Sequence, residues 1–218
     1  MRVYFISGLG ADRRAFRNIK LPQGFEAVYL DWFSPYQEET LEAYAKRMSA
    51  GIDQRQPFAL IGLSMGGMVA VEISKISKPA ILILISSIPR SSCLPAIYRW
   101  AGAMGMHRCI PINWLKSGML LKRFFMVESL PDREQIIAMV KQADPLFIRW
   151  ALRAILRWRN TGVPQTYFHI HGDQDEIFPI HHVQPTHIVR GGKHLMVLNH
   201  AADVNKYLAE ILATPTVK

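Results

Sequence analysis

Residues 57–72 read PFALIGLSMGGMVAVE, and this stretch decides the fold. Its first part, Phe58 to Ile61, is short, apolar and closed by Gly62, which predicts a buried strand. From Met68 onward, apolar residues recur at a helical spacing, so only about four residues connect the strand to a helix. A turn this short predicts strained backbone angles at its apex, which is Ser64.

The turn carries the pattern G-x-S-x-G, with Gly62 and Gly66 on either side of Ser64. Glycine is expected here because so sharp a turn leaves no room for a β-carbon. Such a turn exposes the serine hydroxyl and directs the amide of Met65 and the helix N-terminus toward one point, where a developing oxyanion would be stabilised. A bare G-x-S-x-G also occurs by chance, but the flanking strand and helix favour a nucleophilic serine.

The order of the apolar segments predicts the architecture. Strands are expected at residues 3–6, 25–30, 58–61 and 80–85, with helical segments between them, the first of which follows a cap at Asp12. This alternation predicts an α/β fold with a doubly wound, mainly parallel sheet and helices on both faces. If the strand order begins 2-1-3, the loop from Ser7 to Gly10 faces the Ser64 turn at the switch point.

The alternation lapses between residues 88 and 160, where four helical patterns occur at residues 94–104, 114–127, 132–143 and 146–159. Two further strands, at 163–170 and 184–189, bring the sheet to about six, and residues 201–212 form a closing helix. We therefore expect a core of residues 1–87 and 161–218 with an inserted helical lid at 88–160.

The net charge of +9 comes almost entirely from residues 88–160, which hold 12 Lys or Arg residues against 4 Asp or Glu. Arg149, Arg153 and Arg157 recur every fourth residue opposite an apolar face. The better interpretation is a solvated helix face, and the alternative is a surface that binds anions or a membrane. No nucleic-acid recognition motif accompanies the charge, so nucleic acid is not an expected partner.

Composition restricts the other classes of function. No apolar run is long enough to span a membrane and no signal-peptide pattern is present, so a cytoplasmic location is expected. Cys93 and Cys109 show neither a disulfide framework nor a ligand pattern. The 8 histidines include no pair at a metal-ligand spacing, so no metal and no cofactor are expected. Oligomeric state cannot be read from these patterns.

A nucleophilic Ser64 needs a base to accept its proton and a third group to orient that base. The loops that follow the fifth and sixth strands supply candidates: Asp173 or Asp175 in the first, and His194 in the second. In a parallel sheet all of them lie at the same edge as Ser64.

The segments GLSMGG at Ser64, GDQDEIFP around Asp175 and GGKHL at His194 together resemble the α/β-hydrolase superfamily over essentially the whole chain. The family's pattern implies that Asp175 rather than Asp173 is the acid and that His194 is the base. It also implies that the backbone amides of Leu9 and Met65 form the oxyanion hole.

The chain departs from the family in two ways. Ser7-Gly8 stands where many members have His-Gly, and the chain begins at the strand that corresponds to the family's third. The resemblance implies a serine hydrolase that acts on a small or medium carboxylic ester, with thioesters close behind. The alternatives are a non-catalytic ligand-binding or sensing protein, or a related chemistry such as carbon-carbon hydrolysis, acyl transfer or perhydrolysis.

Overall fold

A single sheet of six parallel strands organises the computed structural model, which describes residues 1–105, 130–162, 164 and 166–214. The strands are β1 (Arg2–Ile6), β2 (Glu26–Tyr29), β3 (Phe58–Leu63), β4 (Ile81–Ile85), β5 (Phe168–Gly172) and β6 (His187–Val189). Their order is β2-β1-β3-β4-β5-β6, and every neighbouring pair is parallel. The predicted doubly wound sheet is confirmed, and its order begins 2-1-3, the condition under which the loop from Ser7 to Gly10 faces the Ser64 turn.

The last two strands differ from their predicted ranges. β5 ends two residues later than expected because His171 and Gly172 pair with Ile188 and Val189 of β6, which keeps both residues in the sheet. The sequence prediction placed His171 in the following loop. β6 begins three residues later than expected, since Pro185 has no amide hydrogen to donate to a neighbouring strand.

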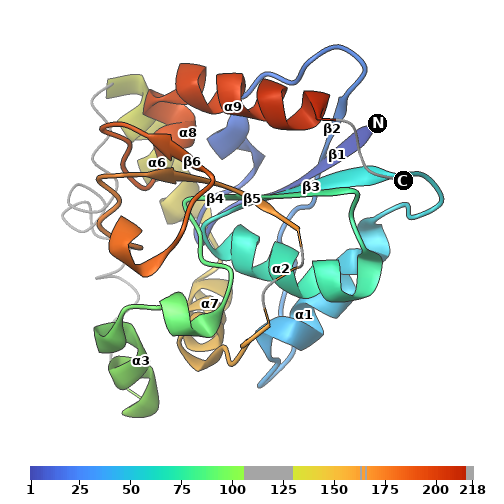
Figure 1. The fold of residues 1–218 in the computed structure, drawn as a ribbon. Helices are drawn as coiled ribbons and strands as arrows, with labels where there is room; N and C mark the ends of the chain where they lie inside the picture. The colour runs from blue at the N-terminus through green and yellow to red at the C-terminus, as the bar shows by residue number, and fades with distance from the viewer. Residues whose placement is uncertain (106–129, 163, 165, 215–218) are drawn as a thin grey trace.

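Helices cover both faces of the sheet (Figure 1). They are α1 (Leu41–Met48), α2 (Met65–Ser77), α3 (Ala96–Ala103), α6 (Leu130–Gln142), α7 (Pro145–Arg157), α8 (Met196–Asn199) and α9 (Ala201–Ala213). Alternate residues of each strand face opposite layers, as the pleat requires. Leu60 and Leu84 pack in the core under α1 and α2, whereas Ile61 and Ile83 pack in the core under α8 and α9.

The first helical segment is shorter than predicted. The side chain of Asp12 caps it by accepting a hydrogen bond from the amide of Arg14, as expected. Only a single 3-10 turn forms, at Arg13–Phe16, in place of a helix through Ile19. This one turn already buries Ala15 and Phe16. A segment this short gains little further stability from adding helical turns.

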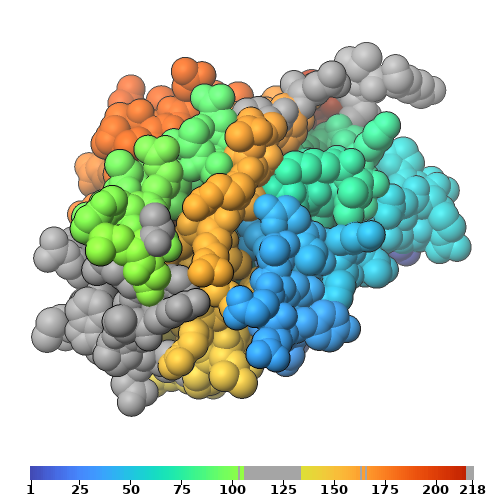
Figure 2. Space-filling view, turned by 90° about the horizontal axis from the view of Figure 1, so that it is seen from below, coloured from blue at the N-terminus to red at the C-terminus, as the bar shows by residue number. Residues whose placement is uncertain are grey.

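Three helices of the segment between β4 and β5 are described, and they match three of the four predicted there: α3, α6 and α7. The fourth prediction, residues 114–127, lies outside the described residues. α7 lies between α3 and the region of α1 (Figure 2). Two tryptophans attach it to the sheet domain. Trp150 Nε1 donates to the Glu39 carbonyl, and Trp158, which directly follows α7, donates through Nε1 to a carboxylate oxygen of Glu72 on α2.

The basic stripe of α7 is exposed at two of its three arginines, and the third contacts the segment that precedes α1. Arg149 and Arg157 are exposed, and Arg153 forms an ion pair with Glu38. The opposite side of the helix is buried through Phe147, Trp150 and its alanines. This arrangement agrees with the interpretation of the stripe as a solvated face.

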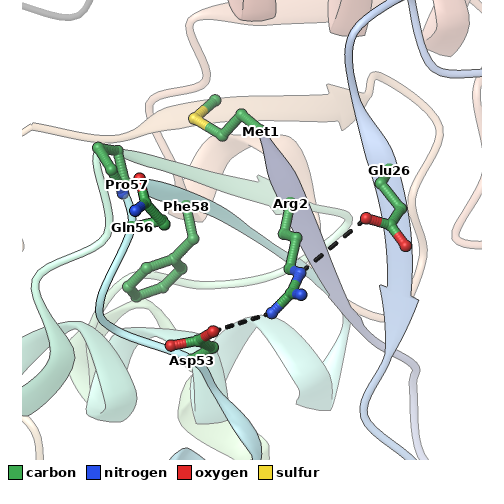
Figure 3. A pocket seen from close by; sticks show the side chains of 7 residues that line it. All are labelled: Met1, Arg2, Glu26, Asp53, Gln56, Pro57 and Phe58. Atoms are coloured by element: carbon green, nitrogen blue, oxygen red, sulfur yellow. Dashed lines mark hydrogen bonds and ion pairs between the residues drawn. The ribbon is translucent and has the colours of Figure 1, made fainter.

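A polar hollow of about 410 Å³ lies at the amino ends of β1 and β3, at the end of the sheet opposite Ser64 (Figure 3). Arg2 projects into it and is paired with Asp53 at 3.0 Å and with Glu26 at 3.9 Å. Asp53 is also bound by Arg55. Because these charges compensate one another, we assign the hollow no function.

Within the described part of the chain, no helix combines the length and the hydrophobicity that crossing a membrane would need. Cys93 is buried and not in a disulfide, whereas Cys109 lies outside the described residues.

Candidate active site

Ser64 occupies the turn between β3 and α2, at the carboxyl edge of the sheet. Its backbone has φ 53° and ψ −120°, a region that residues other than glycine rarely adopt. A β-carbon on Gly66 would lie 2.3 Å from the carbonyl oxygens of Ile6 and Ser7, so only glycine allows α2 to approach β1 this closely. The strained apex predicted from the sequence is therefore present at Ser64.

The side chain of Ser64 contacts a histidine from the other half of the chain. Ser64 Oγ lies 2.8 Å from Nε2 of His194, which comes from the loop after β6. His194 Nδ1 lies 2.8 Å from Oδ2 of Asp175, in the loop after β5. The structure thus brings together three residues from three loops at one edge of the sheet. His194 and Asp175 are both 3% exposed.

The second carboxylate oxygen of Asp175 is held by its own loop. Oδ1 accepts hydrogen bonds from the amides of Ile177 and Phe178, both at 2.9 Å. Burial by itself would raise the pKa of Asp175. The charge and hydrogen bond of His194 oppose it, together with His171 and the Phe178 amide, and the pKa of Asp175 stays below its usual value. Asp175 is therefore ionised at neutral pH and can stabilise a positive charge on His194.

Asp173, the other candidate acid, points elsewhere. Its Oδ1 accepts a 2.7 Å hydrogen bond from the amide of Gly191, and its Oδ2 lies 3.4 Å from Arg190. Asp173 thus ties the loop after β5 to the loop after β6. It thereby supports the two loops that carry Asp175 and His194.

The loop after β1 lies against the nucleophile. A β-carbon on Gly8 would be 3.3 Å from Cβ of Ser64. Ser7 Oγ donates to the carbonyl of Ala11 at 2.8 Å, and Trp32 Nε1 donates to the same carbonyl at 3.1 Å. Ser7 replaces the histidine of many family members and braces the loop through its hydroxyl. Asp12 is adjacent but caps the following turn and pairs with Arg14, so it does not brace this loop.

The two amides expected to form an oxyanion hole are Leu9 and Met65. Within the described residues, neither amide donates to another group of the protein. Met65 is the first residue of α2, so its amide has no preceding turn of helix to bind. Both amides are thus without an acceptor among the described residues.

The family of the chain follows from its sequence as a whole. The model of the alpha/beta hydrolase family matches residues 3–206. The chain belongs to the α/β-hydrolase family. Membership confirms the resemblance seen in the three motifs and supports a hydrolase function. Among curated proteins, no sequence matches this chain.

Solved structures of three other proteins have a similar fold. A thermophilic esterase from Thermogutta terrifontis has a TM-score of 0.76 at 19% identity, covering 100% of this chain and 91% of its own. An enol-lactonase from Burkholderia xenovorans has a TM-score of 0.76 at 16% identity, covering 97% and 90%. RedJ, a thioesterase of the prodiginine pathway in Streptomyces coelicolor, scores 0.65 at 18% identity, covering 96% and 83%. At these identities the similarity establishes the fold alone.

The remaining histidines form no metal centre in the described residues, where no group of three or more potential ligands converges. His200 lies at the N-terminal end of α9, 3.6 Å from Asp203, which indicates a structural role. The rings of His181 and His182 lie against each other in a 3-10 turn, with centroids 4.2 Å apart. His187 Nδ1 is hydrogen-bonded to the hydroxyl of Thr186.

Sequence reasoning missed several residues that surround the site. Ser87 Oγ donates to the carbonyl of Ser64, Trp32 donates to the carbonyl of Ala11 in the loop after β1, and His171 lies 3.6 Å from Asp175. His171 carried a signal in its alternation with His169, since two histidines on one face of a buried strand are unusual. Ser87 and Trp32 carried none, because nothing in their local sequence indicates what they contact.

A cavity of about 360 Å³ adjoins the loop after β1. It opens between that loop, the segment after β2 and the junction of α6 with α7, and Ser64 is not part of its lining. The lining is partly aromatic, through Trp32, Phe33 and Phe147, and its charged residues are all aspartates.

Proposed function

We propose that this chain is a serine hydrolase that cleaves a small or medium carboxylic ester through an acyl-enzyme on Ser64. The observation that carries the proposal is the continuous hydrogen-bonded series from Ser64 through His194 to Asp175. An alcohol is a weak nucleophile at neutral pH, and this series supplies the base and the group that orients it.

In the proposed reaction, Ser64 Oγ attacks the carbonyl carbon while His194 Nε2 takes its proton. Asp175 accepts the Nδ1–H of His194, which keeps Nε2 free to act as the base and stabilises the imidazolium that forms. The amides of Leu9 and Met65 stabilise the negative oxygen. The tetrahedral intermediate then expels the alcohol, which leaves with the proton from His194.

Water completes the cycle. It attacks the acyl-enzyme carbonyl and gives its proton to His194, and collapse of the second intermediate returns that proton to Ser64 and releases the acid. No metal or cofactor is required for any step. Residues 88–160, which lie between β4 and β5, are the proposed lid, and the cavity beside the oxyanion loop is the proposed space for part of the substrate.

Thioesters are the second substrate class, because the same nucleophile and oxyanion hole act on both. The names of the structural neighbours, an esterase, an enol-lactonase and a thioesterase, support an acyl-carbonyl substrate without choosing among them. A panel of p-nitrophenyl esters and acyl thioesters of increasing chain length would decide the class and the acyl preference.

The direct test compares the unaltered protein with Ser64→Ala. We expect p-nitrophenyl ester turnover to be lost in the variant while thermal unfolding is unchanged, since alanine keeps the β-carbon of Ser64 and removes only its hydroxyl. A fluorophosphonate probe should label the unaltered protein at Ser64 and leave the variant unlabelled. Turnover that survives in Ser64→Ala would contradict the mechanism.

The main competing function is a ligand-binding or sensing protein that retains the fold without catalysis. Such a protein needs no activated serine, so it should resist the fluorophosphonate. Labelling combined with inactivity toward every ester and thioester would instead favour carbon-carbon hydrolysis, acyl transfer or perhydrolysis, all of which use the same three residues.

A further inference from the structure

Two buried histidines lie directly behind Asp175. His169 and His171 are two residues apart on β5, so both point to the same face of the sheet. His169 is opposite Leu84 of β4, which packs in the core on the α2 side. Both histidines are fully buried. The proposed mechanism gives neither of them a part.

The two rings and the loop that carries Asp175 are joined by hydrogen bonds. Nε2 of His171 lies 2.8 Å from the carbonyl oxygen of Phe178, and Nδ1 of His171 lies 3.0 Å from Nε2 of His169. The rings are nearly perpendicular, at 83°. Nδ1 of His169 has no hydrogen-bond partner in the described part of the chain.

These partners determine which nitrogen of each ring carries hydrogen. A carbonyl oxygen can only accept, so His171 Nε2 must carry a proton and donate it to Phe178. A neutral His171 then has a bare Nδ1, which accepts from His169 Nε2–H. The unpartnered Nδ1 of His169 is the bare nitrogen of that neutral ring. Donation therefore runs in one direction, from His169 through His171 to Phe178.

Both rings are neutral at physiological pH. Burial lowers the pKa of His169 to about 3, with the neighbouring His171 adding to the effect and the backbone of Ser87 and the charge of Asp175 opposing it. Burial also lowers the pKa of His171, although Asp175 and the Phe178 carbonyl oppose it. Neutrality matters because His171 Nε2 is 3.6 Å from Asp175 Oδ2. A cation there would compete with His194 for the charge of Asp175.

Phe178 connects this pair to the candidate site. Its amide donates to Asp175 Oδ1 and its carbonyl accepts from His171, so one residue is held from both sides. Its ring also packs edge-on against the ring of His194, with centroids 5.6 Å apart. Loss of the hydrogen bond to the carbonyl would free the loop that orients both Asp175 and His194.

We propose that His171 is a positioning residue that fixes the Asp175 loop through the Phe178 carbonyl, and that His169 holds His171 in the Nε2–H tautomer this requires. The inference rests on the proposed function, because it takes Asp175 as the acid. Neither histidine touches the reacting atoms.

A matched pair of amides tests the assignment. In His171→Gln the amide nitrogen reaches the position of Nε2 and can donate to Phe178, whereas in His171→Asn it reaches only the position of Nδ1. We expect kcat for p-nitrophenyl acetate to fall about 10- to 100-fold in His171→Asn, with KM within about twofold, and to stay within about threefold of the unaltered protein in His171→Gln. His187→Gln, on β6 and outside the hydrogen-bonded path, is the control and should retain full activity.

Nuclear magnetic resonance of the imidazole nitrogens gives a readout that does not depend on activity. At pH 7 the unaltered protein should show neutral Nε2–H tautomers for both His169 and His171. The Nδ1–H proton of His194 should keep its resonance in His171→Gln and shift or broaden in His171→Asn. These spectra remain decisive if no ester is hydrolysed, which would refute the proposed function alone, or if His171→Asn does not fold.

The outcomes separate cleanly. Equal kcat values for folded His171→Asn and His171→Gln would overturn the positioning role. So would an Nδ1–H or cationic His171 in the unaltered protein, whatever its activity. Two results together would support it. His169 and His171 would both be neutral Nε2–H rings, and kcat or the His194 Nδ1–H resonance would be lost in His171→Asn and retained in His171→Gln.

Discussion

The hydroxyl of Ser87, just after β4, donates a 2.6 Å hydrogen bond to the backbone carbonyl of Ser64. Both residues lie at the carboxyl ends of adjacent parallel strands, so the bond ties the strained turn to its neighbour. A β-carbon on Gly67 would lie 2.3 Å from the same hydroxyl oxygen, which shows how closely α2 packs on this contact. The turn is thus supported from outside as well as shaped by its own sequence.

Ser87→Ala removes that support. We expect the free energy of unfolding to fall by about 1 kcal/mol, as is usual for one buried hydrogen bond. Urea denaturation measures the change. Ser74→Ala is the control, because Ser74 donates to Val71 within α2 at a half-exposed site, and its loss should change stability by less than about 0.5 kcal/mol. Equal losses of stability in the two variants would show that the hydrogen bond from Ser87 to Ser64 contributes no more than the one within α2.

Gly66→Ala tests the close approach of α2 to β1. The new methyl would overlap two backbone carbonyl oxygens, which cannot move without separating helix from sheet. We expect a loss of at least about 3 kcal/mol or failure to fold, measured by thermal and urea unfolding. Gly162→Ala, whose β-carbon would lie at an ordinary 3.5 Å from Asn160, should stay within about 1 kcal/mol of the unaltered protein. An unchanged stability of Gly66→Ala would mean that α2 does not lie this close to the carbonyl oxygens of Ile6 and Ser7.

Separate asparagine substitutions distinguish the two candidate acids. Asp175→Asn removes the negative charge beside His194. It also places an amide group next to His194 Nδ1, and this amide can donate a hydrogen bond and so favour the wrong tautomer of the ring. We therefore expect kcat to fall by about 100-fold or more. Asp173→Asn can still accept from the Gly191 amide through its carbonyl oxygen, and its kcat should stay within about threefold. Steady-state ester hydrolysis measures both, and the reverse ranking would make Asp173 the acid.

Stability should depend on pH through the buried histidines. The pKa of His169 is about 3 in the native protein, against about 6.5 in an unfolded chain. Between these values the unfolded chain binds a proton that the native state does not. The free energy of unfolding therefore falls as pH falls below about 6.5, by up to about 1.4 kcal/mol per pH unit for this one group. His171, whose pKa is also lowered, acts in the same direction.

Urea denaturation at several pH values between 8 and 4 checks this dependence. His169→Gln removes one titrating ring and keeps a donor for His171, so its stability should fall less steeply with acid. If His169 is instead protonated in the native state, the free energy of unfolding of His169→Gln should depend on pH as steeply as that of the unaltered protein.

Trp158→Phe tests the attachment of α7. Trp158 Nε1 donates to a carboxylate oxygen of Glu72 on α2 at 2.7 Å, and both side chains are buried. Phenylalanine fills most of the space but leaves that oxygen without its donor, which should cost about 1–3 kcal/mol. Trp100→Phe, at a site 61% exposed on α3, should have little effect. Similar losses in both variants would indicate that packing rather than the hydrogen bond accounts for the cost.

Local sequence was sufficient for much of the fold because its signals are short-range. Short continuous apolar runs predicted the strands, helical spacing predicted α1, α2, α7 and α9, and the G-x-S-x-G turn predicted the position of Ser64. Predictions were wrong where a partner strand decided the outcome. His171 looks like a loop residue from its neighbours in sequence, yet pairing with β6 keeps it in the sheet.

The sequence by itself determined the alternation of strands and helices, the apex at Ser64 and a short set of candidate partners, since turn geometry and hydrophobic period depend only on nearby residues. Tertiary structure alone decided which candidates meet. Asp173 and Asp175 differ by two positions, and only the folded loop directs one to Gly191 and the other to His194. The hydrogen bonds of Ser64 with His194 and Ser87 span 130 and 23 residues, and contacts of that range form only when the sheet brings the ends of its strands to one edge.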